Sequence, residues 1–357
     1  MSIGTTTSLL TLCLAATGSV LVAPELAHAQ ARDGTQWVMP RTAAGHPDLQ
    51  GNWSNATITP IQRPADRGPT LTLEQVTEVE GGRQDRIEER NRPSDPDRVA
   101  PPVGGDGSTG AAGGVGGYNY FWIDAGDRVA ILDGEHRSSL ITRPENGRRP
   151  ALTEEYRERR AARRASRGSF GQYDNPENRP LAERCLLSFG SNAGPPMLPN
   201  YFYNNNYTIV QTPDHVMIMT EMVHDARIIK LLDRKPPPDK HIRPWFGDSW
   251  GWWEGDVLVV ETTNINPRQS LQGIPASPDL KVIERFSRAD EFTLKYEFTI
   301  DDPTTYTETW GGEVPFMKID ELVYEYACHE GNYAMSNVLS GARAQERENR
   351  QNESDQR

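Results

Sequence analysis

The chain has 357 residues and a formal net charge of −12, from 50 acidic and 38 basic side chains. This acidic balance argues against nucleic acid or an anionic membrane surface as the main partner. Beyond the N-terminal region, no apolar stretch is long enough to span a membrane. The expected partner is a small-molecule ligand or substrate, and composition leaves the oligomeric state open.

The first thirty residues have the pattern of a secretory signal peptide. Residues 8–23 are apolar but short for a bilayer span, and Ala27 and Ala29 are small residues at the positions a signal peptidase reads. The segment before them lacks Lys and Arg, so a buried N-terminal helix is the alternative. We therefore expect cleavage after residue 29 and a periplasmic or secreted protein.

Loss of residues 1–29 leaves two cysteines, Cys185 and Cys328. In an oxidising compartment such a pair usually forms a disulfide. Two buried free thiols or a redox pair are the alternatives, but the C-x-x-C spacing of redox pairs is missing. We predict a Cys185–Cys328 disulfide that closes a loop of more than a hundred residues.

Residues 30–117 are expected to form an irregular arm, one helix and a flexible loop. The arm is rich in proline and carries two tryptophans, which would anchor it on the surface of the domain. A helix is predicted over residues 72–91, where Thr72 and Gln75 fit a capping box. Residues 104–117 contain eight glycines without the Gly-Lys-Ser/Thr of a phosphate loop, so we expect a flexible loop.

Residues 118–344 have the pattern of a mainly β domain with one inserted helix near residues 153–167, whose arginines favour a solvated basic face. A hairpin is predicted over residues 120–132. Short, regularly spaced strands argue for an antiparallel barrel or sandwich, a lipocalin-like barrel among them. Residues 345–357 are polar and are expected to be disordered. The later strands are predicted at 207–212, 215–224, 227–232, 250–254, 256–263, 281–287, 291–300, 306–310 and 322–327.

Alternation along these strands sorts the polar residues by face. Glu284 shares a face with Val282 and Phe286, so we expect an inward carboxylate that is paired, hydrogen-bonded or protonated. Arg, His or Tyr side chains of neighbouring strands are the expected partners. His224 is expected to end an apolar strand face, with Asp225 directly after it.

Glu221 and Glu261 also fall on apolar faces of their strands. The functional hypothesis is an acid–base set at the mouth of a cavity, in which His224 is the base, Asp225 orients it, and Glu221, Glu261 or Glu284 lies opposite. The structural alternative is a buried salt-bridge network that ties the strands together.

Two clusters mix polar and aromatic side chains, as pockets for rings or sugars do. One is residues 196–207, where Asn side chains that satisfy their own loop are the alternative. The other is the tryptophan-rich strand at residues 250–254, whose tryptophans cannot all face inward. The residues expected to contact a bound molecule are Tyr203, Asn204, Asn205, Asn206, Arg227, Trp252, Trp253, His329 and Glu330.

The sequence contains no motif that fixes a chemistry. No histidine lies in H-x-H, H-E-x-x-H or a Cys/His cluster, so no metal and no other cofactor are predicted. Recruitment of a metal by His224, His241 or His329 stays open. A Gly-x-Ser-x-Gly elbow is missing as well, which argues against a serine hydrolase.

The runs HPDLQGNWSNATITPIQRP, NNNYTIVQTPDHVMIMTEMVHDARII, WWEGDVLVVETTNIN and YEYACHEGNY resemble a large group of secreted bacterial proteins of unassigned activity. The resemblance covers most of the mature chain and implies no activity. A fainter likeness, of architecture alone, is to lipocalin-like hydratases and cyclases, and it implies a β-barrel that holds an apolar molecule.

Taken with the residues, this favours a periplasmic or secreted enzyme with acid–base chemistry of the lyase, isomerase or hydrolase type. Its substrate would be a small apolar or aromatic molecule bound in a cavity of the β domain. The alternative is a non-catalytic periplasmic protein that binds such a molecule.

Overall fold

The computed structural model describes residues 37–90, 92, 97, 99, 123–167, 171–190, 192–200, 202–233, 239 and 241–356. The expected signal peptide and the glycine-rich segment 104–117 lie outside this part of the chain. All described helices and strands belong to one unit, Val38–Arg357. Within the described residues, no helix combines the length and apolar character needed to cross a membrane.

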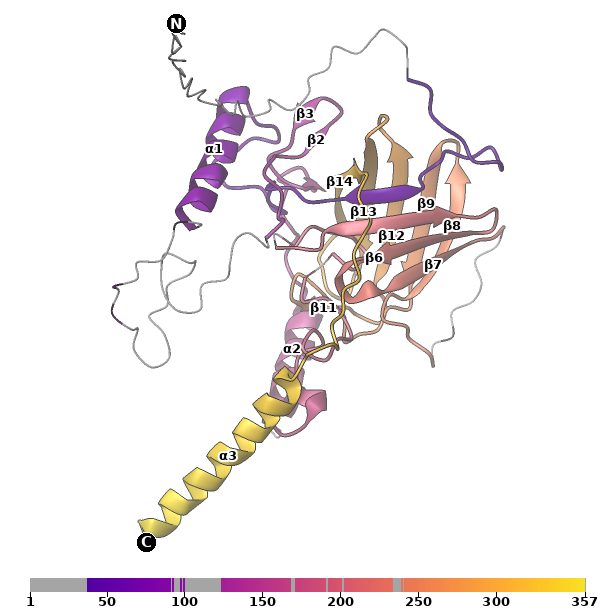
Figure 1. The fold of residues 1–357 in the computed structure, drawn as a ribbon. Coiled ribbons are helices and arrows are strands. Elements are labelled where there is room, and N and C mark those ends of the chain that lie inside the picture. The colour runs from indigo at the N-terminus through magenta and orange to yellow at the C-terminus, as the bar shows by residue number, and fades with distance from the viewer. Residues whose placement is uncertain are drawn as a thin grey trace, which may run out of the picture. The chain divides into compact units, whose positions relative to one another are not determined.

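Nine strands form a closed barrel (Figure 1). Around the ring their order is β1, β5, β6, β7, β8, β9, β12, β13 and β14, and β14 pairs with β1 to close it. All neighbours are antiparallel except β7 and β8, which run parallel. The mainly β fold is confirmed, as a barrel. The strand bounds are β1 Gly51–Ser54, β5 Asn206–Gln211, β6 His215–Thr220, β7 Ala226–Leu231, β8 Asp248–Glu254, β9 Val257–Thr263, β12 Lys281–Arg288, β13 Thr293–Asp301 and β14 Trp310–Ile319.

The predicted strands of the barrel are recovered within a few residues, with three differences. Strand β1 comes from the segment expected to be an irregular arm, and it closes the barrel between β5 and β14. The predicted strand at 306–310 is mostly a turn that leads into β14, and residues 322–327 are not a strand. Tyr306 forms only an isolated bridge with Leu152, and Trp310 is the first residue of β14.

Five short strands of the described residues lie outside the ring or beside it. Ile141–Arg143 (β4) pairs with β14, and Ser270–Leu271 (β10) pairs with Ile274–Pro275 (β11). Ile131–Leu132 (β2) pairs with Glu135–His136 (β3) across Asp133 and Gly134, so this hairpin replaces the one predicted over residues 120–132. Residues 120–122 of that prediction lie outside the described residues.

The first two helices agree with the prediction. Helix α1 spans Leu73–Arg90. The capping box ahead of it is present, since the Thr72 amide donates to Gln75 Oε1 at 3.0 Å and the Gln75 amide donates to Thr72 Oγ1 at 3.3 Å. Helix α2 spans Glu154–Arg167 and begins after Thr153, whose hydroxyl accepts a hydrogen bond from the Tyr156 amide at 3.1 Å.

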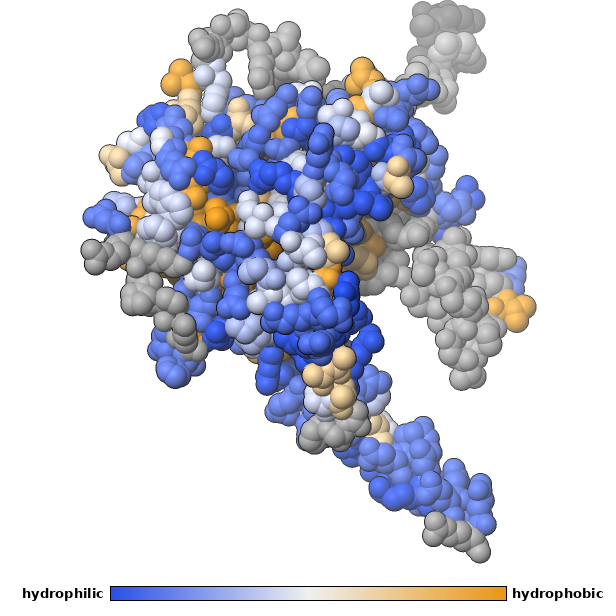
Figure 2. Space-filling model, turned by 180° about the vertical axis from the view of Figure 1, so that it is seen from behind, coloured by the Kyte–Doolittle hydropathy of each residue, from blue (hydrophilic) through white to orange (hydrophobic). Residues whose placement is uncertain are grey.

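A third helix, α3, spans Ala334–Asp355 and replaces the disordered segment expected from residue 345. None of its residues is buried, and its surface is mostly hydrophilic (Figure 2). Composition was a poor guide because Arg, Gln, Glu and Ala are good helix formers that need no apolar face. Pairs one turn apart, such as Arg343 with Glu346 at 2.7 Å, support the helix instead.

The barrel interior is filled by side chains rather than hollow. Its inward faces carry large aromatic residues with relative exposures of 0–1%. A segment outside the barrel strands, residues 192–199, is buried along its whole length and contributes Met197 and Leu198 to the same core. We call this segment the plug. The fully buried rings are Trp53, Tyr207, Phe286, Tyr296, Phe298, Trp310 and Phe316.

Candidate functional site

One group of predicted site residues lies inside the barrel. Glu284 on β12 accepts two hydrogen bonds from the Arg227 guanidinium of β7, at 2.7 and 3.0 Å. The Tyr296 hydroxyl of β13 donates to Glu284 Oε1 at 2.8 Å. The side chains of Arg227 and Glu284 are 5% and 0% exposed. The inward position of Glu284 and its pairing with Arg and Tyr are therefore confirmed.

The electrostatics of this group favour a fixed ion pair. Burial opposes the charge on Arg227, but the attraction of Glu284 and its hydrogen bonds outweigh burial and hold the pKa of Arg227 above its ordinary value. Burial, together with the neighbouring carboxylate of Glu284, raises the pKa of Tyr296 well above its ordinary value. Arg227 was predicted to contact a bound molecule. Its guanidinium instead holds Glu284 in place.

The plug is bonded to the same group. The Met197 amide donates to the Tyr296 hydroxyl at 2.9 Å, and the Tyr207 hydroxyl donates to the Asn192 carbonyl at 2.7 Å. Asn55 donates both to the Tyr207 hydroxyl and to the Met197 carbonyl. Tyr296, Tyr207 and Asn55 thus bind the backbone of the plug, and the plug lies where a ligand cavity was expected.

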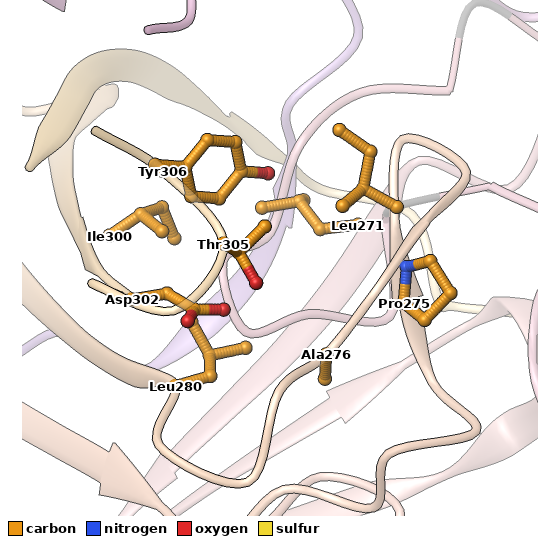
Figure 3. Close-up of a pocket in the computed structure, with 9 residues that line it drawn as sticks. Leu271, Pro275, Ala276, Leu280, Ile300, Asp302, Thr305 and Tyr306 are labelled. Atoms are coloured by element: carbon orange, nitrogen blue, oxygen red, sulfur yellow. The ribbon is translucent and has the colours of Figure 1, made fainter. Parts of the chain in front are cut away.

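A small hollow is present near one end of the barrel, beside β10 and β11 (Figure 3). Its cavity volume is about 10 Å³, which is room for about one water molecule. Apolar side chains surround it together with the carboxylate of Asp302 and the ring of Tyr306. A substrate of the expected size does not fit this hollow as it stands.

A second group of predicted residues lies at the turn between β6 and β7. Strand β6 ends at Thr220, and a 3₁₀ turn, Met222–His224, follows. His224 therefore does not end an apolar strand face, and its side chain is exposed. The reason is local, because Val223 and His224 have φ values of 70° and 48°, which turn the chain out of the strand.

The ring of His224 is held in one orientation. Its Nδ1 lies 2.8 Å from the carbonyl oxygen of Tyr326, so Nδ1 carries the proton and donates it to that oxygen. In the neutral ring the lone pair is then on Nε2. Asp225, the next residue, is half-buried. Burial raises the pKa of Asp225, and the nearby His224 opposes that rise.

The two other predicted carboxylates do not face the interior. Glu221 is buried at the start of the turn, where its Oε2 accepts a hydrogen bond from Asn206 at 2.8 Å. Glu261 lies on the outer face of β9, since Val260 and Thr262 point inward opposite Glu284 and Val282. Alternation failed at Glu261 because both faces of β9 carry apolar residues, Val257 and Val259 on one and Leu258 and Val260 on the other.

The Tyr/Asn loop mostly satisfies its own backbone. Asn205 is buried, accepts from the Asn200 amide at 3.1 Å, and donates to the Asp124 carbonyl at 3.0 Å. The Asn204 carbonyl accepts from Asn192 at 2.8 Å. The Asn205 side chain thus satisfies backbone groups of the loop and of a neighbouring segment, which is close to the structural alternative. Beside them, Phe189, Phe202 and Tyr203 meet edge to face, with centroid distances of 5.0–5.9 Å.

The predicted disulfide between Cys185 and Cys328 is present. It joins the start of the Tyr/Asn region to the C-terminal segment that carries Tyr326. Ser188, close behind Cys185, donates to the Met222 sulfur at 2.7 Å. His329 and Glu330 follow Cys328 directly and are exposed. The disulfide therefore gathers the loop, the turn and the C-terminal segment into one region, which we call the rim.

Backbone strain is concentrated at the rim. Among the described residues, seven other than glycine have positive φ, and four of these belong to the rim. Val223 is the least expected, because a β-branched side chain is poorly tolerated there. Such strain is typical of functional sites, where the surrounding structure compensates for it. The four residues are Cys185, Asn204, Val223 and His224.

The tryptophan-rich strand divides its side chains between the two faces of the barrel. Trp252 lies on the outer face, 4.4 Å from the ring of Trp250, and donates to Glu254 at 2.9 Å. Trp253 faces inward and stacks on His46 at 4.6 Å. The N-terminal arm thus covers one tryptophan, and neither Trp252 nor Trp253 lies at the rim.

No metal site is formed by the residues that the structure describes, where no group of three or more His, Cys, Asp and Glu side chains converges. His224 lies at the rim, whereas His241 lies in the segment between β7 and β8. Sequence reasoning missed Tyr296, Tyr207, Asn55 and the plug. Of these features, the alternation of the strands predicts only the inward position of the two tyrosines.

Comparison with known proteins adds no relative: no family model, no curated protein and no solved structure matches the chain. The fold and the two residue groups define a closed nine-stranded barrel protein with a filled, charge-bearing interior and a strained, disulfide-bound rim.

Proposed function

We propose that the protein is an exported enzyme that performs acid–base chemistry, of the lyase, isomerase or hydrolase type, on a small apolar or aromatic molecule. The proposal is carried by the state of His224. The Tyr326 carbonyl fixes the proton on Nδ1, which leaves Nε2 as the proton acceptor on an exposed ring. A positioned base of this kind contributes about 10²–10⁴-fold in rate.

Asp225 supplies the complementary group. Its raised pKa makes it a better proton donor at mild pH than an ordinary carboxyl. In the proposed reaction His224 Nε2 removes a proton from the substrate, and Asp225 or a water molecule returns one to the product. Glu284, Glu261 and Glu221 take no part, because the first is closed inside the barrel, the second lies on the outer wall and the third is bonded to Asn206.

The substrate would lie outside the barrel, at the rim. The rings of Phe189, Phe202 and Tyr203 offer an apolar surface, and Phe189 is 53% exposed. Ser188, the residue before Phe189, contacts Met222, which lies two residues before His224 in the chain. An edge-to-face cluster with an open side suits a flat apolar or aromatic molecule.

An exported location supports the same proposal. A disulfide persists in oxidising compartments such as the periplasm or the medium and is rare in the cytosol. It also holds the carbonyl that positions His224, so the proposed base depends on an oxidising location.

The test uses purified protein and a metabolite extract. Wild type, His224→Gln and the control His241→Gln are each incubated with the extract, and consumed compounds are identified by mass spectrometry. We expect compounds that wild type and His241→Gln consume and His224→Gln does not, with equal melting temperatures. Equal consumption by all three variants would overturn the proposal. A compound bound by wild type but not converted would favour the non-catalytic binding protein instead.

A further inference from the structure

A hollow lined by arginines lies on α2, outside the segments that form the rim. Its lining residues are Arg157, Arg160, Ala161 and Arg164. Their spacing of 0, 3, 4 and 7 residues is that of the four-residue hole on one face of a helix, the kind that accepts a knob from a partner. The cavity volume is about 410 Å³, far larger than the hollow beside β10 and β11.

The charges around this hollow are mostly unneutralised. Arg157 pairs with Glu154 at 2.8 Å, on an exposed part of the first turn. Arg159, on a different face, pairs with Glu155 and donates to the Thr305 hydroxyl at 2.9 Å, which ties α2 to the barrel. For Arg160 and Arg164 no acidic partner is found among the described residues. Within the described part of the chain, two guanidinium groups without an acidic partner and a third that is paired with the exposed Glu154 therefore surround the small side chain of Ala161.

The small residue at the floor of the hollow, Ala161, determines which ligand groups can enter it. Ala161 leaves space between the three long side chains, so a compact group can lie close to the helix with a guanidinium on each side. Guanidinium groups form planar, two-point hydrogen bonds to carboxylate and phosphate oxygens. A single carboxylate can form this two-point bond with one guanidinium group. A phosphoryl group has enough oxygens to accept hydrogen bonds from all three guanidinium groups. The protein as a whole is acidic, but this attraction acts within a Debye length of about 8 Å, where the nearby arginines dominate.

We propose that this hole on α2 is a binding site for a phosphoryl group, carried by a small phosphate ester, by free phosphate or by a lipid headgroup. The site is independent of the proposed chemistry at His224. Its occupant sits over Ala161 and accepts hydrogen bonds from Arg157, Arg160 and Arg164.

The experiment is calorimetric titration of the full chain at low ionic strength, with inorganic phosphate, glycerol 3-phosphate and vesicles of phosphatidylglycerol in phosphatidylcholine as three separate arms. Saturable binding of at least one of them is expected. The first two arms identify a small ligand, and binding to vesicles alone identifies a lipid headgroup. No saturable binding in any arm would overturn the proposal.

Three variants locate the site. Arg160→Gln/Arg164→Gln should weaken binding at least about tenfold, because charge-assisted bonds to two guanidiniums are lost. The control Arg347→Gln/Arg350→Gln removes the same charge from exposed positions of α3 and should leave binding unchanged. Ala161→Leu keeps every charge but fills the floor, and it should weaken binding by a similar factor. If Ala161→Leu or Arg160→Gln/Arg164→Gln binds as tightly as wild type, the hole is not the site.

Discussion

Arg227 and Glu284 form a two-point ion pair across the barrel interior, although the two strands that carry them are separated by β8 and β9. The pair is closed to solvent and receives a third hydrogen bond from Tyr296. A buried charge without its partner is costly, so each of these residues depends on the other.

The first prediction follows from this dependence. Glu284→Gln should lower the free energy of unfolding by about 3–5 kcal/mol, because Arg227 is left buried and uncompensated. Urea denaturation followed by tryptophan fluorescence measures this change. The double variant Arg227→Met/Glu284→Leu should recover most of the loss. A Glu284→Gln protein as stable as wild type would show that the interior admits water to the charge.

The second prediction concerns the bond between the barrel and its plug. Tyr296→Phe removes the hydroxyl that accepts from the Met197 amide and donates to Glu284, so the free energy of unfolding should fall by about 1–3 kcal/mol. Tyr306→Phe is the matched control, since the described residues offer its hydroxyl no hydrogen bond. Similar losses for both variants would argue against a specific role of the Tyr296 hydroxyl.

A third prediction is the pH dependence set by Asp225. Burial raises the pKa of this carboxyl in the folded protein, so the folded state holds its proton more tightly than the unfolded state does. The stability that this proton confers is present at acid pH and is lost as the pH rises through the folded pKa. Asp225→Asn should therefore gain stability relative to wild type as the pH rises above the ordinary Asp pKa of about 3.9. Urea midpoints at several pH values test this, with Asp320→Asn as an exposed control.

A fourth prediction joins the disulfide to His224. The Cys185–Cys328 bond closes a loop with a sequence separation of 143. In the chain-entropy model, Cys185→Ser/Cys328→Ser should lower the free energy of unfolding by about 5 kcal/mol. Where the variant is still folded, Tyr326 is no longer tied beside the turn, and His224 should exchange between its two neutral tautomers.

The ¹⁵N chemical shifts of the His224 ring report this exchange directly. In wild type the shifts should show a proton on Nδ1, and in the variant they should move toward an average of both nitrogens. His136, far from the disulfide in sequence, is the internal reference. An unchanged His224 tautomer in a folded variant would mean that the disulfide does not position the carbonyl.

The sequence predicted the fold well wherever strands alternate cleanly. In β12 one face carries Val282, Glu284 and Phe286, and this alternation alone predicted an inward carboxylate with an Arg, His or Tyr partner. The partner's identity depends on strand order, which alternation does not contain. Glu261 shows the limit of the method, because both faces of β9 carry valine or leucine and the sequence does not say which face is inward.

The site at the rim was harder to predict for a different reason. His224 points outward because Val223 and His224 both adopt left-handed backbone conformations. Valine and histidine rarely adopt this conformation, so the sequence does not predict it. Its hydrogen-bond acceptor is a backbone carbonyl 102 residues away. Because every residue has a backbone carbonyl, the sequence does not show which one His224 contacts. The predicted disulfide was the one long-range restraint that brought Tyr326 toward the turn.

The single parallel contact between β7 and β8 has a geometric origin. Around a closed ring of strands, direction can alternate at every step only when the number of strands is even. With nine, at least one pair of neighbours must run the same way, and here that seam has three register pairs. Parallel pairing is slightly weaker per residue. Arg227 lies on one side of this parallel contact and Glu284 on the other, so their ion pair links the two sides of a pairing that the backbone alone holds weakly.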